Sequence, residues 1–173
     1  MSLTADVEGM RLTVPAGWWI WKYDDSAFHQ TQFQNFAGGS KAVDAVALDP
    51  LGTLWLNELK DYRKYPRRKP SSVFDEVASK VRSTLAGLAV ARVRADMPEH
   101  SQADQALRCS GVRVVLQLAQ VGRPHRLFPQ AIDPADADTQ LRRRVKHVDR
   151  KPICATGSLG AHNQMLPWNT VDL

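Results

Sequence analysis

The chain has few cysteines. Its 173 residues include two, Cys109 and Cys154, which are far apart and lack a CxxC partner pattern. This predicts reduced, mostly buried thiols in place of a disulfide framework. A domain of this length buries about 70% of the surface of its unfolded chain, so disulfides are not needed for its stability. We therefore expect a single domain over residues 1–173 of a cytoplasmic protein.

Long apolar runs are missing as well. The N-terminus has no basic start followed by an apolar run, which predicts no signal peptide. The longest aromatic cluster, GWWIWKY at residues 17–23, is too short to cross a bilayer. These features predict a soluble protein with no membrane partner.

Three common chemistries lack their motifs. The five histidines have no zinc-ligand spacing. The stretch AGGSKA at residues 37–42 lacks the full spacing of a phosphate loop and precedes a predicted strand. Ser110 and Ser158 have no nucleophile-elbow context. The sequence therefore disfavours a zinc site, a phosphate loop and acyl hydrolysis.

Positive charge is in excess and is clustered. The chain carries 23 Lys and Arg against 18 Asp and Glu, a formal net charge of +5. Basic residues crowd two segments, residues 63–69 and 142–147. Each cluster is compatible with a polyanionic partner and equally with an ordinary solvated surface.

The residue pattern predicts alternating strands and helices. Residues 71–93 form the clearest helix, with Ser71 or Ser72 as N-cap and Val73, Val77 and Val81 on one face. The other predicted elements are strands at 9–14, 18–23, 112–121 and 151–158, short helices at 24–38 and 102–108, a helix at 133–149, and a hairpin within 41–69. This order predicts an α/β fold whose mixed central sheet is flanked by helices. Within the domain we expect N-terminal strands and a short helix at 1–40, the α/β core at 41–158, and an irregular C-terminal arm at 159–173.

The hairpin contains charged residues within apolar strands. Its turn, Asp49-Pro50-Leu51-Gly52, favours a type I turn followed by a left-handed Gly52, so Asp49 pairs with Thr53. In that register Asp44 lies opposite Glu58, and Lys60 lies on the same face two residues further along. A four-residue loop would instead place Asp44 opposite Asn57.

Two opposed carboxylates repel each other by about 0.2–1 kcal/mol, and by more when buried. A structural hairpin gains nothing from such a pair. A divalent cation that bridges the carboxylates would turn the repulsion into attraction. The pattern therefore favours a site over a harmless solvated face.

Asp44 followed by Glu58-Leu59-Lys60 on the next strand resembles the signature of the PD-(D/E)xK nuclease superfamily, with its restriction-endonuclease-like core. The helix at 71–93 and the strand at 112–121 follow in the order that this resemblance implies. Val43 stands where the signature has proline. No clear glutamate stands on a helix before the first strand, where many members place an acid or a histidine.

The resemblance implies a role in the active site for each of these residues. Asp44, Glu58 and the backbone carbonyl of Leu59 would bind Mg²⁺, for which Mn²⁺ could substitute. Lys60 would orient or deprotonate the attacking water and stabilise the transition state. Residues just beyond Lys60 would hold flanking phosphates: Tyr62, Arg63, Lys64, Arg67, Arg68 and Lys69. Asp24, Asp25 and His29 are candidates for the upstream ligand, and Lys80 and Gln117 for a later polar contact.

Two functions follow as hypotheses. The first is a metal-dependent endonuclease or exonuclease that hydrolyses phosphodiester bonds in DNA, with RNA and single strands left open as substrates. The second is a catalytically silent nuclease-like module that binds nucleic acid or a partner protein. A homodimer and a partner from genome defence or repair are both compatible with either hypothesis.

Overall fold

The computed structural model describes residues 2–64, 69–120, 132–157 and 166–173. The strands are β1 (Thr4–Val7), β2 (Met10–Thr13), β3 (Trp19–Trp21), β4 (Ala45–Leu48), β5 (Thr53–Asp61), β6 (Gly111–Ala119), β7 (Ile153–Gly157) and β8 (Asn169–Asp172). The helices are α1 (Val73–Arg94), α2 (Glu99–Leu107) and α3 (Pro134–Val145), and three short helical turns are η1 (Tyr23–Asp25), η2 (His29–Phe33) and η3 (Phe36–Gly38).

The central sheet is mixed, as the sequence predicts. Its five strands are in the order β3-β4-β5-β6-β7. The pairs β3–β4 and β4–β5 are antiparallel, whereas β5–β6 and β6–β7 are parallel. The chain passes from β5 to β6 through α1 and α2, and from β6 to β7 through α3. Parallel neighbours require such long connections, since a tight turn can join only antiparallel strands.

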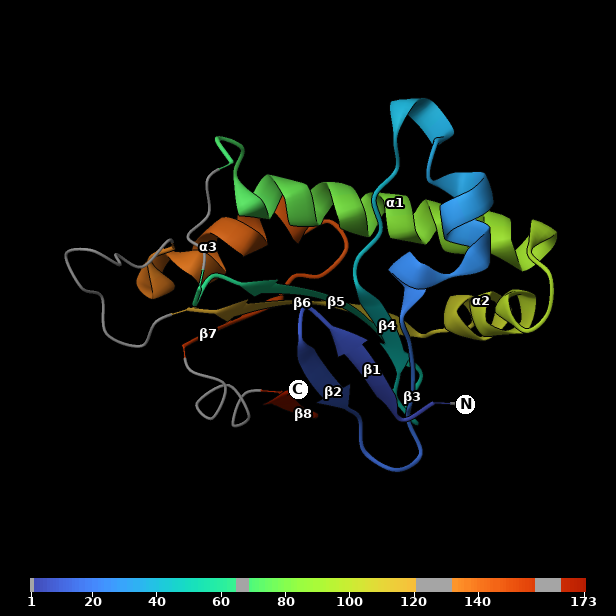
Figure 1. Ribbon diagram of the computed structural model, residues 1–173, viewed down its shortest axis with the longest axis horizontal. Coiled ribbons are helices and arrows are strands. Elements are labelled where there is room, and N and C mark those ends of the chain that lie inside the picture. The colour runs from blue at the N-terminus through green and yellow to red at the C-terminus, as the bar shows by residue number, and fades with distance from the viewer. Residues whose placement is uncertain (1, 65–68, 121–131, 158–165) are drawn as a thin grey trace.

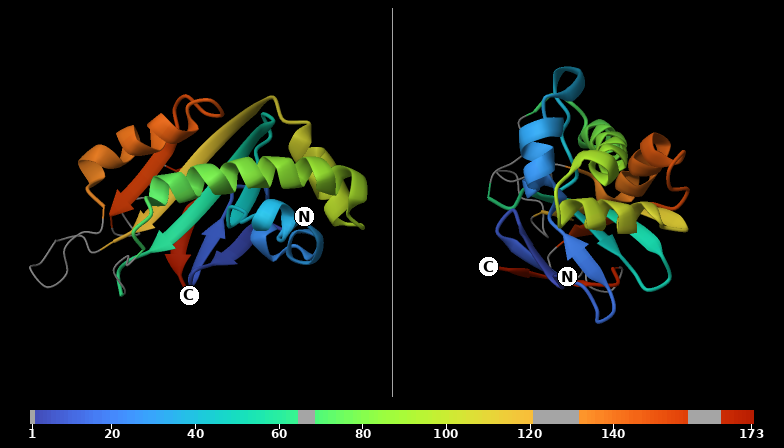
Figure 2. Two further views of the ribbon diagram at one scale, coloured as in Figure 1. Left: turned by 90° about the horizontal axis from the view of Figure 1, so that it is seen from above. Right: turned by 90° about the vertical axis from the view of Figure 1, so that its right-hand side faces the viewer.

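Each face of this sheet is covered. Helices α1 and α3 lie on one face, and β1, β2 and β8 form a second sheet on the other (Figure 1). Along β5 the side chains alternate between these layers, so that Leu54 and Leu56 pack toward the helices and Leu59 packs toward the second sheet. Even-numbered residues of β5, including Glu58 and Lys60, therefore face α1, which runs across the strands (Figure 2).

The second sheet changes one expectation from the sequence, that of an irregular C-terminal arm. Its strand order is β1-β2-β8, and β8 pairs antiparallel with β2. Part of the predicted C-terminal arm, residues 159–165, lies outside the described residues. The end of that arm is not irregular, because Asn169–Asp172 form β8 and bury Thr170.

The predicted helix at 24–38 is three short turns. Ala37 has a left-handed φ of 53° and interrupts the helical path near its end. A distant residue fixes the start of the middle turn, since the Glu99 carboxylate accepts hydrogen bonds from the backbone nitrogens of Ala27 at 2.7 Å and Phe28 at 2.8 Å. Such a contact cannot be read from the local pattern.

α1 confirms the clearest helix prediction. It begins after Ser72, whose side chain accepts a hydrogen bond from the Phe74 nitrogen. The face toward the sheet is apolar, with Val77, Val81 and Leu88 buried. Lys80 flanks this apolar face with 15% of its side chain exposed, and it is the residue through which α1 contributes to the candidate site.

Candidate functional site

The turn at residues 49–52 has the predicted geometry. The Asp49 nitrogen donates to the Thr53 carbonyl at 3.1 Å, and Gly52 has a left-handed φ of 81°. The Asp49 carboxylate holds the turn, because its Oδ1 accepts from the nitrogens of Leu51 and Thr53 at 2.9 and 2.8 Å. The register that follows pairs Leu48 with Leu54. The predicted three-residue loop is therefore confirmed.

This register brings Asp44 to Glu58. Ala45 pairs with Asn57, so Asp44, one residue before β4, comes opposite Glu58. Its Oδ2 accepts a hydrogen bond from the Leu59 nitrogen at 2.7 Å. Both acids are buried, with exposed fractions of 5% for Asp44 and 1% for Glu58. Two buried carboxylates therefore share the helix-facing side of the hairpin.

A threonine of α1 holds the segment that carries Asp44. The Val43 nitrogen donates to Thr84 Oγ1 at 2.9 Å, and neither residue is exposed to solvent. Since an unpaired buried N–H is costly, this bond fixes the backbone next to Asp44. The β4–β5 hairpin and helix α1 thus position the carboxylate together.

We expect Thr84→Val to lower the free energy of unfolding by about 1–3 kcal/mol, because the Val43 N–H would lose its acceptor in a buried site. Urea denaturation measures the loss, and hydrogen exchange at the Val43 amide should become faster. Thr84→Ser retains the hydroxyl and serves as the control. Equal stability of the valine and wild-type proteins would contradict this role of Thr84.

Two lysines meet the buried carboxylates. Lys60 Nζ and Lys80 Nζ each lie 2.6 Å from Glu58 Oε1. Lys80 also lies 3.4 Å from Asp44 Oδ1, so one ammonium group contacts both acids. Sequence reasoning proposed Lys80 as a later polar contact, and the structure places it directly against the acids.

The charges of the site shift one another's pKa values. Burial raises the pKa of Glu58, Asp44 adds to this effect, and the two lysines oppose it. For Lys60 burial lowers the pKa, but Glu58 and Asp44 raise it by more, so its pKa is above the ordinary value. Lys60 is therefore a cation at neutral pH. Glu58 Oε2 is buried and has no hydrogen-bond partner among the described residues.

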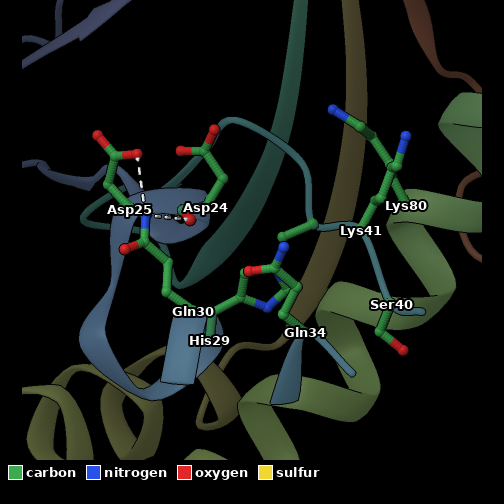
Figure 3. Close-up of a pocket in the computed structure, with 9 residues that line it drawn as sticks. Asp24, Asp25, His29, Gln30, Gln34, Ser40, Lys41 and Lys80 are labelled. Atoms are coloured by element: carbon green, nitrogen blue, oxygen red, sulfur yellow. Dashed lines mark hydrogen bonds between the residues drawn. The ribbon is translucent and has the colours of Figure 1, made fainter. Parts of the chain in front are cut away.

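The upstream candidates lie around a neighbouring pocket. It has a volume of about 310 Å³ and lies between η1, η2, Ser40–Ala42 and Lys80 of α1 (Figure 3). Asp24 lines it and has a partly buried side chain, whose Oδ1 has no partner among the described residues. Asp25 is exposed and pairs with Lys22 at 2.5 Å. His29 is buried, and burial and nearby Lys80 lower its pKa.

Asp24 is electrostatically coupled to the carboxylate pair. Burial raises its pKa to about 7, and Asp44 and Asp25 contribute to the increase. Because the folded state holds this proton more tightly than the unfolded chain, stability from this group is present near pH 4 and is lost as the pH rises to about 7. Asp24 is thus a third acid near Asp44 and Glu58.

We expect Asp24→Asn to make the protein more stable than wild type at pH 8 and to reduce the fall in stability between pH 4 and pH 7. The reason is that asparagine has no proton to lose. Thermal unfolding across this pH range measures the effect. Asp96→Asn, at an exposed acid outside this pocket, is the control and should keep the wild-type fall in stability. Identical pH profiles for Asp24→Asn and wild type would refute the coupling.

The predicted basic loop is only partly available to an anion. Arg63 donates to Asp61 at 2.8 Å and to Asp172 of β8 at 2.7 Å, and these bonds raise its pKa. Tyr62 is partly buried against the core. Lys64 and Lys69 are exposed. Arg67 and Arg68 lie outside the described residues. Sequence reasoning could not foresee the ion pair to Asp172, because it depends on β8.

Gln117 does not reach the site. On β6 it points toward the second sheet, where its side-chain nitrogen donates to Asn57 Oδ1 at 3.0 Å and its oxygen accepts from Thr170 at 2.9 Å. The expectation of a later polar contact from Gln117 is wrong, because its neighbours Leu116 and Leu118 occupy the helix-facing positions.

The site offers Mg²⁺ only part of an oxygen ligand set. In the described residues there is no group of three or more His, Cys, Asp and Glu side chains arranged to hold a metal ion. The two buried carboxylates supply the hard oxygen ligands that Mg²⁺ prefers, and Glu58 Oε2 lacks a partner among the described residues. The chemistry of Asp44 and Glu58 fits the ion, while both acids face ammonium groups in the state described.

Other predictions concern the thiols and the membrane. Cys109 and Cys154 are free, and burial raises the pKa of Cys154 to about 12. None of the helices in the described ranges is long and apolar enough to cross a membrane.

The chain is similar to a known protein over part of its length. No protein-family model matches the chain. A cysteine–tRNA ligase of Neisseria meningitidis serogroup A is 33% identical over 107 residues, which cover 57% of this chain. The matched segment spans 15% of the length of that ligase. No solved structure matches the chain.

Proposed function

We propose that the chain is a metal-dependent nuclease of the PD-(D/E)xK superfamily, with a restriction-endonuclease-like core, that hydrolyses phosphodiester bonds in DNA. The observation that carries the proposal is the meeting of Asp44, Glu58 and Lys60 on one face of the β4–β5 hairpin. Had Asp44 and Glu58 pointed to opposite faces of the hairpin, they could not share a metal ion.

The arrangement of the surrounding elements supports the proposal. The antiparallel strands β4 and β5 are followed by α1 and then by β6, which is parallel to β5. This is the order that the resemblance to the superfamily implies after the motif. Helix α1 covers the face that carries the acids and contributes Lys80.

Each side chain has a distinct task in the proposed reaction. Asp44 and Glu58 would hold Mg²⁺, which would supply an activated water and offset charge on the scissile phosphate. Lys60 is cationic, so it stabilises developing negative charge more readily than it accepts a proton. The Leu59 nitrogen fixes Asp44 in place.

A cleavage assay with the wild-type protein tests the proposal. Linear, circular and single-stranded DNA are incubated with Mg²⁺, Mn²⁺ or EDTA. We expect cleavage with either metal and none with EDTA. An RNA substrate belongs in the panel, because the partly similar ligase is named for tRNA. Since the similarity spans 15% of that ligase, we do not extend the ligation reaction to this chain.

A second candidate is a nuclease-like module that binds nucleic acid or a partner protein without cutting. The observation in its favour is that Lys60 and Lys80 already neutralise Glu58 at 2.6 Å. Binding of DNA with no cleavage in either metal would favour this candidate. Cleavage that depends on metal and on Lys60 would exclude it.

A further inference from the structure

A second pocket adjoins the carboxylate pair and is lined mainly by lysines. It has a volume of about 390 Å³, and four of its seven lining residues are Lys41, Lys60, Lys69 and Lys80. We call it the lysine pocket. Lys60 and Lys80 connect it to Glu58, and Lys41 and Lys80 also line the pocket that contains Asp24 (Figure 3).

The charges of the lysine pocket are unevenly compensated. Lys60 and Lys80 are paired with Glu58, and Lys69 lies 3.9 Å from Glu76. Lys41 is exposed and makes no ion pair with any described residue. Among the residues that line the pocket, four lysines stand against one acid, Glu76, so the lining itself has a net positive charge.

The lining chemistry favours a phosphate group. An ammonium group offers three donors, and a phosphate has several oxygens that can accept from more than one lysine at once. Ser79, on the exposed side of α1, adds a hydroxyl donor. The volume of about 390 Å³ falls within the range of about 300–1,000 Å³ that is typical of small-molecule sites, so a phosphate can enter with its attached sugar.

We propose that the lysine pocket binds a phosphate group of a nucleic-acid strand, with Lys41 as the main contact. The inference rests on the proposed function for its placement, because a phosphate held there is next to Glu58 and hence next to the bond that is cut. The inference assigns a role to Lys41, which the sequence motif does not include. It assigns no phosphate contact to Arg63, because the carboxylates of Asp61 and Asp172 already accept hydrogen bonds from that side chain.

Fluorescence anisotropy of a 3′-labelled single-stranded oligonucleotide tests the inference. The oligonucleotide is used with a 5′-phosphate and with a 5′-hydroxyl, in EDTA and in Ca²⁺, to keep binding separate from cleavage. We expect Lys41→Gln to weaken binding about tenfold, which is the loss of one charge-assisted contact. The slope of log K against log salt should fall by about 0.7. Lys151→Gln, at an exposed lysine before β7 and outside both basic clusters, is the matched control.

The outcomes separate the two proposals. A loss of binding with both oligonucleotides identifies an internal phosphodiester, and a loss only with the 5′-phosphate identifies a terminal phosphate; both support the pocket. Equal affinity of Lys41→Gln and wild type for both oligonucleotides overturns it, as does a wild-type protein that binds neither. Binding that depends on Lys41 in a protein that never cleaves DNA keeps the pocket and rejects the nuclease. Cleavage by wild type together with unchanged binding in Lys41→Gln keeps the nuclease and rejects the pocket.

Discussion

Lys60→Ala should lower the rate of metal-dependent DNA cleavage by about 10²–10³-fold, which is the usual cost of removing one positioned group that stabilises transition-state charge. Lys60 lies against Glu58 with 17% of its side chain exposed, so its ammonium group acts in a partly dry site. Its raised pKa keeps it charged at neutral pH. The loss should therefore appear in the rate of the chemical step.

The rate is measured as the conversion of supercoiled plasmid to nicked and linear forms in Mg²⁺, under single-turnover conditions. Lys151→Ala, at an exposed lysine just before β7 and outside both basic clusters, should cleave at the wild-type rate. Urea denaturation of each variant shows whether a lost rate reflects a lost fold. Full activity in Lys60→Ala would show that the activity belongs to another site or to a contaminant. The proposed role of the motif would then be rejected.

The hairpin shows what local sequence can determine. Asp49 and Gly52 carry the turn, and the turn fixes every pair along β4 and β5, including the approach of Asp44 to Glu58. A strand has a side-chain period of two, so the register also decides which face the charges share. The central motif was predictable because it depends on contacts between residues that are close in the chain.

Other parts of the site depend on distant contacts. Glu99 fixes the turn that begins near Ala27, and Asp172 of β8 engages Arg63. Residues 169–172 have little strand signal by themselves, and they form β8 by pairing with β2. Lys41 lies in an irregular segment that α1 holds through Thr84, so nothing in its neighbours marks it as part of a pocket. These features arise from tertiary structure and could not be read from periodicity.

The clustering of charge at Glu58 has a consequence for stability as well as for function. Replacing one partner of a buried ion pair leaves the other charge uncompensated, which typically costs about 3–5 kcal/mol, whereas replacing both partners with apolar residues of similar size is often neutral. Glu58 is 1% exposed, and the Nζ atoms of Lys60 and Lys80 each lie 2.6 Å from its Oε1. The site should therefore be sensitive to the loss of the carboxylate alone.

We expect Glu58→Leu to lower the free energy of unfolding by about 3–5 kcal/mol, because Lys60 would lose its carboxylate partner and Lys80 would keep only Asp44, at 3.4 Å. Urea denaturation at pH 7 measures the loss. The double variant Glu58→Leu, Lys80→Met is the informative control. It should recover much of the stability, because Lys60 lines the lysine pocket and its ammonium group can reach the solvent there. If the losses in free energy of unfolding of Glu58→Leu and Lys80→Met add in the double variant, Glu58 and Lys80 are not coupled. Recovery of stability without recovery of cleavage would show that the chain keeps this costly group of charges for its chemistry and not for its fold.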